Sequence, residues 1–500
     1  MASQAQSSQP QASAEKAPTA NDPGSSEHEG QEGLDIPDEQ LFALARRIAT
    51  DHLGMSTSGG EIPDVWLGCS NVVFIVQFDR PDNDTPFNIA IRVPKMDKGV
   101  ALRPHAAKSM KSQATTLRHI LENTNIPVPE IYHLDVTAEN EISMPYMAMS
   151  FLGGQPLYKF WAGEGLTPSD REQLRLKCLA SLAHVMAQFS TMSFDMHGSL
   201  AENKSGSTSV GPLYETDPCA NCPVCLKEKG IPDLKVRGPY ASALKELKAD
   251  YKESLGRLTN PQEPREKGLL RIMERLLLCL GKLDASLKGY VLCPPYLDRQ
   301  NILVGDDGTV TGLVDWDEVE TAPRWHGYAR FPMFLTRDWE AYGVIDWDEP
   351  KHARFDKDSA RLEAYRAYYN MEMTRALDGK GDSALTQRSH LVHAIWVAGV
   401  NITCRENICI KFMLAANLVP AVADGKDDAD PEAEGGDGDS DNEGSVGSQD
   451  SENSYGSRYL ETDGDEAQGV DVDKCLVTIA GYDKEQLDAM EAKLKKFVLG

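Results

Sequence analysis

The sequence lacks any long hydrophobic run, since no stretch approaches the roughly 20 apolar residues of a membrane-spanning helix. Its first residues have no basic region followed by an apolar stretch, so we expect no signal peptide. Basic side chains are scarce, with 51 Lys and Arg against 77 Asp and Glu and a net charge of −26. A basic stripe for nucleic acid is therefore not expected. We predict a cytoplasmic protein, with a nuclear location as the alternative, that binds neither membranes nor nucleic acid.

Cysteine is also sparse and scattered. Ten cysteines spread through predicted helices and strands indicate reduced thiols of a cytosolic or nuclear protein. The exception is the cluster Cys219, Cys222 and Cys225, which offers three soft ligands for Zn²⁺. A second cysteine pair is missing nearby, so the fourth ligand would be a distant residue such as His197. Three alternatives stay open for the cluster: free or redox-active thiols, a zinc site, or a disulfide.

The negative charge is concentrated in one part of the chain. Residues 421–474 carry 18 acidic and 3 basic side chains, a net of −15, and we expect them to be disordered. Residues 1–34 are rich in Ser, Gln, Ala, Pro and Glu and are predicted to be a disordered tail. After the acidic segment, the apolar spacing of residues 475–500 predicts a helix that packs on the body.

Apolar periodicity changes from strand-like to helix-like along the chain. Residues 72–76 and 88–93 predict a β-hairpin, and residues 108–123 predict a helix. Farther on, three apolar faces at helical spacing begin at Leu179, Leu269 and Leu362, which predicts a mainly helical second half. The fold class is therefore α+β, with the β structure near the N-terminus.

The most informative segment is 290–316. A β run leads into a polar loop, Asn301 opens a second β run, and a third run ends at Asp315 after a tight turn at residues 306–308. An amide and a carboxylate are thereby placed at neighbouring strand ends. Hard oxygen ligands in this arrangement suit a Mg²⁺ ion that bridges nucleotide phosphates.

This segment resembles the catalytic segment of the aminoglycoside phosphotransferase family, a branch of the protein-kinase-like fold, and most closely its fungal-type subgroup. Residues 126–132, 145–154 and 323–339 resemble other stretches of the family in the same order. The resemblance covers about residues 60–410. It implies a bilobal fold that uses ATP and Mg²⁺, with Asn301 and Asp315 as the metal ligands. The implied lobes are a small β-rich N-lobe, residues 35–150, and a larger helical C-lobe, residues 151–420, with a Cys-containing loop insertion at 198–237.

The resemblance also implies which residues contact the nucleotide. Ser70 and Asn71 lie where the family has its phosphate-covering loop, although this loop has a single glycine. Arg92 matches the strand cation that contacts phosphates, with Lys95 as the competing cation. Ser150 lies within residues 145–154, the segment that resembles the hinge strand.

Two positions, Tyr296 and Gln113, depart from the family pattern. Tyr296 stands where the family has its catalytic Asp, five residues before Asn301, and a phenol with a pKa of about 10 is a poor base near neutral pH. Asp298 is a weak substitute because it points a different way on an extended loop. Gln113 stands in place of the Glu that pairs with the strand cation, which keeps a hydrogen bond but loses the charge. Asp317 and Glu318 are interpreted as solvated turn acids, with assistance to the metal or recruitment of a cationic substrate as the alternative.

The sequence therefore predicts a nucleotide- and Mg²⁺-binding protein with impaired catalysis, a pseudokinase-like scaffold. The alternative is an active ATP-dependent phosphotransferase acting on a small-molecule hydroxyl. A lesser one is a zinc-supported interaction module on an inactive kinase-like body. The substrate and any small-molecule or protein partner are not specified by the sequence.

Overall fold

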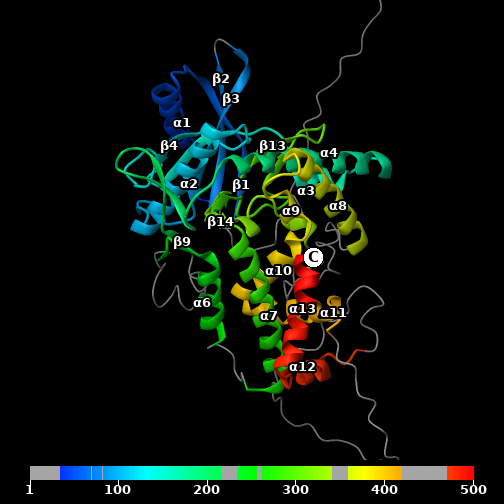
Figure 1. Ribbon diagram of the computed structural model, residues 1–500. Coiled ribbons are helices and arrows are strands. Elements are labelled where there is room, and N and C mark those ends of the chain that lie inside the picture. Colours follow the sequence, from blue (N-terminus) through cyan, green and yellow to red (C-terminus); the bar gives the residue numbers. More distant parts are fainter. Residues whose placement is uncertain are drawn as a thin grey trace, which may run out of the picture.

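The computed structural model describes residues 34–68, 70–80, 83–215, 234–255, 262–339, 358–418 and 470–500. The chain forms two lobes (Figure 1). The N-lobe is an antiparallel sheet with helices on both faces, and the larger C-lobe is mainly helical with short hairpins facing the N-lobe. The predicted α+β fold, with a small β-rich N-lobe and a larger helical C-lobe, is confirmed.

The N-lobe sheet has five strands in the order β1-β2-β3-β5-β4. Its elements, in chain order, are α1 (Asp38–Leu53), β1 (Ser58–Leu67), β2 (Asn71–Arg80), β3 (Asn83–Pro94), α2 (Pro104–Asn123), β4 (Ile131–Asp135) and β5 (Tyr146–Ser150). The hairpin expected at 72–93 is β2 and β3, and β1 adds a strand that the sequence analysis did not predict.

Strand β2 shows why this sheet carries a helix on each face. Val72, Phe74 and Val76 are buried in a cluster with α1, whereas Ile75 is buried in a cluster with α2. Successive side chains of a strand point to opposite faces of the sheet. A strand whose odd and even positions are both apolar therefore needs a packing element on each face. The two helices thus fix the sheet and the positions of polar residues at its edge.

Five C-lobe helices, α6, α10, α11, α12 and α13, pack on α7, which lies beside α13 in Figure 1. Buried residues of α6, α7, α10, α11, α12 and α13 form one apolar cluster. The helices are α3 (Leu157–Ala162), α4 (Pro168–Ala187), α6 (Ala243–Leu255), α7 (Pro264–Ser286), α8 (Ser359–Ala376), α9 (Ser383–Thr386), α10 (Ser389–Val400), α11 (Ile402–Ala415), α12 (Val472–Ala480) and α13 (Lys484–Leu499), with 3-10 turns η1 (Gln188–Thr191), η2 (Arg324–His326) and η3 (Met333–Leu335).

Short strands form the side of the C-lobe that faces the N-lobe. The hairpin β12 (Ile302–Val304) and β13 (Val310–Leu313) pairs with β6 (Gln155–Pro156), and β11 (Tyr290–Leu292) pairs with β14 (Thr321–Pro323). Two more pairs are β7 (Ser199–Glu202) with β8 (Thr208–Gly211), and β9 (Leu213–Glu215) with β10 (Lys235–Arg237). The described parts of residues 198–237 are therefore not loop, as expected, but two antiparallel strand pairs, and the insertion itself stays a prediction.

Gly154 lets the connection between the lobes pass close to the β12–β13 hairpin. Its φ is +116°, and a Cβ at this position would lie 2.3 Å from Thr311 Oγ1 and 2.8 Å from the carbonyl oxygen of Val304. Thr311 also donates a 2.6 Å hydrogen bond to the carbonyl oxygen of Gly153. Only glycine fits this approach, so the inter-lobe connection is held directly against the hairpin that carries Asn301 and Asp315.

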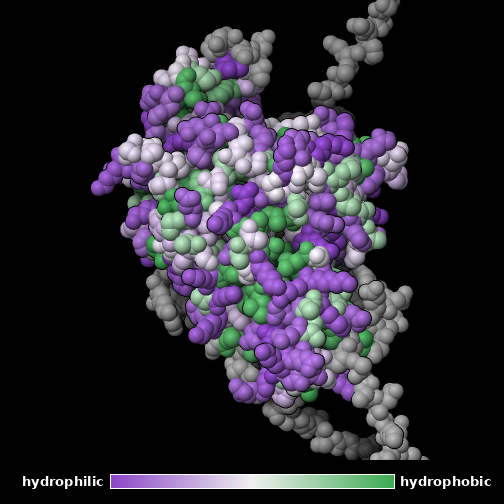
Figure 2. Space-filling model, in the orientation of Figure 1, coloured by the Kyte–Doolittle hydropathy of each residue, from purple (hydrophilic) through white to green (hydrophobic). Residues whose placement is uncertain are grey.

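Two predicted segments fall largely outside the described residues. The tail at 1–34 is described only at residue 34, and the acidic segment at 421–474 only from residue 470. Their predicted disorder stays a prediction. The described helices include none that is long and apolar enough to cross a membrane. On the face shown in Figure 2, hydrophilic residues predominate and apolar patches lie between them.

Candidate functional site

The β12–β13 hairpin brings Asn301 and Asp315 together. The pairing of Ile302 with Leu313 puts the residues just outside the ladder opposite each other, and Val314 N donates a 3.0 Å hydrogen bond to the carbonyl oxygen of Asn301. Asn301 Nδ2 lies 2.9 Å from the carbonyl oxygen of Tyr296 and 3.5 Å from Asp315 Oδ2. The amide nitrogen thus faces the protein, and the amide and carboxylate oxygens are the atoms with ligand chemistry for a hard cation.

The Asp315 carboxylate is in an environment that favours a cation. Its backbone has a φ of +62°, a conformation that is costly for a residue with a Cβ and that directs its side chain toward Asn301. Burial, with a smaller contribution from the neighbouring Asp317 charge, raises the pKa of Asp315. A divalent cation would supply the missing compensation, so the two side chains fit a Mg²⁺ ion.

Asp317 lies at the centre of a network that joins the two lobes. Its carboxylate forms a close ion pair with Arg92 of β3, accepts a 2.6 Å hydrogen bond from Gln113 Nε2 of α2 and a 3.1 Å bond from Asn71 Nδ2. Arg92 Nη1 also donates a 2.9 Å bond to Gln113 Oε1, as the replacement of Glu by Gln predicts. The interpretation of Asp317 as a solvated turn acid is therefore wrong, since the turn aims it at three N-lobe donors.

Ser70 and Ser150 are the other two residues that were predicted to contact the nucleotide. Ser70 is exposed in the turn between β1 and β2, and its carbonyl oxygen accepts a 2.9 Å hydrogen bond from Lys95 N. Ser150, at the end of β5, accepts a 2.9 Å hydrogen bond at its Oγ from Glu130 N. Ser150 thus has a structural role at the strand edge, and nucleotide contact by either serine stays a prediction.

Tyr296 occupies the position of the expected catalytic base and is 43% exposed. Its hydroxyl donates a 3.2 Å hydrogen bond to Glu318 Oε2, and burial followed by the charge of Glu318 raises its pKa above the ordinary range. A phenol whose anion is further disfavoured cannot accept a proton at neutral pH. Glu318, which has a φ of +57°, is the carboxylate nearest to this hydroxyl among the contacts described.

Asp298 is not available as a substitute base. It is 5% exposed, and its Oδ2 forms a close ion pair with Arg337, while its Oδ1 accepts a 2.8 Å hydrogen bond from Arg299 N. Both carboxylate oxygens are therefore used inside the protein. The sequence reasoning that Asp298 is a weak candidate agrees with this placement, but the reason is its ion pair rather than the direction of an extended loop.

A histidine and arginine cluster supports the same loop from behind. Arg330 Nη2 donates 3.1 Å hydrogen bonds to the carbonyl oxygens of Pro294 and Pro295, and its Nη1 lies 3.2 Å from His326 Nε2. That nitrogen is 2.9 Å from His393 Nδ1, and the two rings stack. Burial and the charge of Arg330 lower the pKa of both histidines. The guanidinium that holds the loop therefore lies beside neutral imidazoles.

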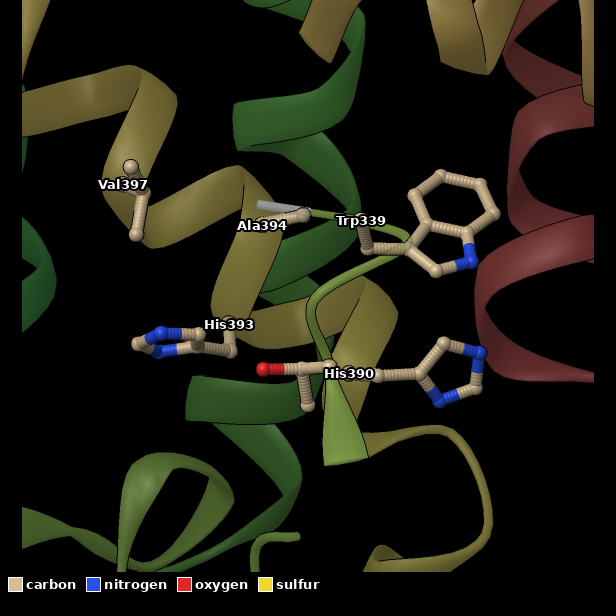
Figure 3. A pocket seen from close by; sticks show the side chains of 6 residues that line it. Trp339, His390, His393, Ala394 and Val397 are labelled. Atoms are coloured by element: carbon tan, nitrogen blue, oxygen red, sulfur yellow. The ribbon is translucent and has the colours of Figure 1, made fainter. Parts of the chain in front are cut away.

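His393 also borders a narrow cavity that has no room for a water molecule (Figure 3). The other lining residues are Thr336, Trp339, His390, Ala394 and Val397. Burial lowers the pKa of His390 to about 3. None of the predicted site residues lines this cavity, and we assign no ligand to it.

The zinc hypothesis gains no support from the described residues. Cys219, Cys222 and Cys225 lie outside them, and the residues described include no group of three or more His, Cys, Asp and Glu side chains suited to a metal. The fourth ligand suggested for the cluster, His197, is already engaged: its Nε2 is 3.1 Å from Glu246 Oε2, and its Nδ1 is 2.6 Å from the carbonyl oxygen of Thr321. The suggestion of His197 is therefore wrong. The six cysteines that are described are buried thiols.

Comparisons with known proteins give distant likenesses. No family model matches the chain. Altered inheritance of mitochondria protein 9, mitochondrial, of Candida albicans (strain WO-1) is 30% identical over 122 residues, which are 23% of this chain and 18% of that protein. The chain thus matches less than a fifth of the length of that curated relative.

Similar solved structures include three kinases or phosphotransferases. A candidate fructosamine-3-kinase from Thermobifida fusca YX-ER1 is 14% identical, with a TM-score of 0.38, over 74% of this chain and 99% of that one. A thermostable mutant of aminoglycoside phosphotransferase APH(4)-Ia is 15% identical, with a TM-score of 0.32, over 71% and 99%. Plasmodium vivax ethanolamine kinase Pv091845 is 12% identical, with a TM-score of 0.32, over 74% and 89%. These scores are low, so the fold is argued from the chain's own elements.

Proposed function

We propose that the cleft between the lobes binds ATP with Mg²⁺ and that the protein is impaired in phosphoryl transfer, acting as a pseudokinase-like scaffold of the fungal-type aminoglycoside phosphotransferase kind. The observation that carries the proposal is the 3.5 Å approach of Asn301 to Asp315. These residues would hold the Mg²⁺. When bound, the ion neutralises charge on the nucleotide phosphates.

The residues of the N-lobe supply the remaining charge complementarity. Arg92 is a guanidinium with 13% of its side chain exposed, and Asn71 lies at the start of β2 beside the expected phosphate-covering loop. Guanidinium and amide donors recognise phosphate oxygens by charge-assisted hydrogen bonds. The two lobes therefore present a metal-binding pair on one side and phosphate donors on the other.

Impairment follows from the base position. The Tyr296 phenol cannot accept a proton from a substrate at neutral pH, and Asp298 is bound in its ion pair with Arg337. Loss of a general base costs on the order of 10²–10⁴ in rate, while nucleotide binding does not require one.

An active small-molecule phosphotransferase is the second candidate, and one observation favours it. Glu318 is within hydrogen-bond distance of the Tyr296 hydroxyl, so a carboxylate does lie beside the position of the usual base. In this case turnover by the wild-type protein would be lost in Glu318→Gln.

Calorimetric titration of the full-length protein with ATP tests the proposal. We expect binding with Mg²⁺ that weakens when EDTA replaces the metal, and Asp315→Asn should weaken the Mg²⁺-dependent part by about 10-fold or more. Asp306→Asn is the matched control, because Asp306 is exposed in the turn of the same hairpin and the change in charge is identical. Absence of ATP binding, or equal binding by Asp315→Asn and the wild type, would overturn the proposed metal–nucleotide site.

A further inference from the structure

The carboxylate of Asp317 is bound by two side chains that are expected to bind phosphate, those of Arg92 and Asn71, and by Gln113. Arg92 contacts both of its oxygens, Gln113 donates to Oδ1 and Asn71 donates to Oδ2. These donors come from β3, from α2 and from the first residue of β2, whereas Asp317 follows β13 in the C-lobe. An anion of the chain itself therefore lies where three separate N-lobe elements converge.

A carboxylate and a phosphate edge have the same recognition chemistry. Each offers two coplanar, negatively charged oxygens that a guanidinium and amide donors bind through charge-assisted hydrogen bonds. Arg92 cannot give the same N–H groups to Asp317 and to a phosphate at once. The two anions must therefore compete.

The backbone around Asp317 is shaped to deliver this side chain. Asp315 and Glu318 have φ values of +62° and +57°, so two residues with side chains adopt left-handed conformations within four positions. Such conformations persist where surrounding contacts hold them. The contact also ties the lobes together, since Asp317 is 204 residues from Gln113 and 246 from Asn71 along the chain.

We propose that Asp317 is an internal anion that latches the cleft, and that the polyphosphate chain of an incoming nucleotide must displace it from Arg92, Gln113 and Asn71. The nature of the ligand rests on the proposed function; the latch itself does not. An intramolecular anion acts at a high effective concentration, so it lowers the apparent affinity for any free polyphosphate by the fraction of molecules that are latched.

The experiment compares full-length wild type with Asp317→Asn and Asp317→Ala by calorimetric titration. The first probe is inorganic triphosphate without metal, which reports on the N-lobe donors alone, and the second is ATP with Mg²⁺. We expect both variants to bind triphosphate on the order of 10-fold more tightly than the wild type. Arg92 keeps its 2.9 Å bond to Gln113 in these variants, so the donors remain oriented.

Two further variants make the result specific. Asp306→Asn removes the same charge from the exposed turn of the β12–β13 hairpin and should leave triphosphate affinity within about two-fold of wild type, because that charge is not at the latch. Arg92→Gln in the Asp317→Asn background should abolish the gain. Thermal unfolding of each variant checks that the fold is intact.

The two probes separate the latch from the proposed function. Equal or weaker triphosphate binding by folded Asp317→Asn and Asp317→Ala overturns the latch, even if ATP binds well. A gain for triphosphate with no ATP binding in any variant supports the latch and removes the nucleotide function. A gain as large in Asp306→Asn as in Asp317→Asn also overturns the latch, because general electrostatics would then explain it.

Discussion

Residues 290–316 have two sides that differ: the side proposed to hold the metal and the side expected to carry the catalytic base. On the metal side, Asn301 and Asp315 lie 3.5 Å apart at the ends of one hairpin. On the base side, where the resemblance leads us to expect a catalytic Asp, the Tyr296 hydroxyl donates to Glu318 and Asp298 is paired with Arg337. The hairpin's register maintains the metal side, whereas the base side depends on one side chain. The proposed function therefore predicts that a single substitution on the base side separates nucleotide binding from turnover.

The largest expected effect tests whether Asp298 is structural. Asp298→Asn removes the buried carboxylate from the close ion pair with Arg337, and breaking a buried ion pair costs about 3–5 kcal/mol of unfolding free energy. Urea denaturation followed by circular dichroism measures the loss. If Asp298 were instead a base held ready for catalysis, its removal would change turnover and leave stability nearly unchanged.

The double variant Asp298→Asn with Arg337→Met is the control for this prediction. It removes both charges, so it should recover part of the stability lost in the single variant. An additive loss in the double variant would contradict the ion-pair explanation.

The next effect tests the base position directly. Tyr296→Asp puts a charged acceptor where the family has one, and we expect ATP consumption with Mg²⁺ to rise by about 10- to 100-fold, because a positioned base contributes to phosphoryl transfer. Tyr296→Asn is the matched control, since it has the same size but no charge. An equal rise in both would indicate that space, rather than basicity, was missing.

Sequence reasoning predicted that Asn301 and Asp315 lie close together, because local patterning determines their separation. Residues 302–304 and 310–313 read as two strands around a tight turn, and the ladder between them necessarily places residues 301 and 315 near each other. The hairpin predicted at residues 72–76 and 88–93 is likewise present as β2 and β3, and the burial of Met490, Leu494 and Val498 follows the helical spacing in the last segment.

Other features have no local signal. Strand β1 contains Gly59, Gly60 and Pro63, and glycine and proline weaken a strand pattern. The sequence therefore does not predict β1, which is defined by its pairing with β2. The role of Asp317 depends on donors more than 200 residues away, and the ion pair of Asp298 needs the fold to bring Arg337 to it. Hence the chemistry of single acids was the least predictable part of the site.

A smaller effect concerns the histidines behind the base side. Burial lowers the pKa of His393 to about 3 and that of His326 well below its usual range, whereas unfolded histidine has a pKa of about 6.5. Between these values the unfolded chain binds protons that the fold excludes. The unfolding free energy should therefore fall as the pH drops below about 6.5.

Urea titrations at about pH 7 and pH 5.5 measure this dependence. We expect the wild type to lose on the order of 1 kcal/mol more than His393→Gln, which has one titrating group fewer. His184→Gln, at an exposed position of α4, should behave as the wild type does. Parallel pH dependences for wild type and His393→Gln would show that this cluster does not sense pH.

The smallest expected effect concerns Gln113, which contacts both Arg92 and Asp317. Gln113→Glu restores the acid expected beside Arg92, and it places a second carboxylate where Nε2 now lies 2.6 Å from Asp317 Oδ1. The new carboxylate takes Arg92 and repels Asp317, so the latch should open partly while the guanidinium stays oriented. We expect inorganic triphosphate to bind about three-fold more tightly, a modest gain because the new acid itself competes for Arg92. Gln113→Met removes the same donor without adding charge and should give a smaller change. Weaker binding by Gln113→Glu than by Gln113→Met would mean that added negative charge, and not the release of Asp317, governs anion affinity on the N-lobe side.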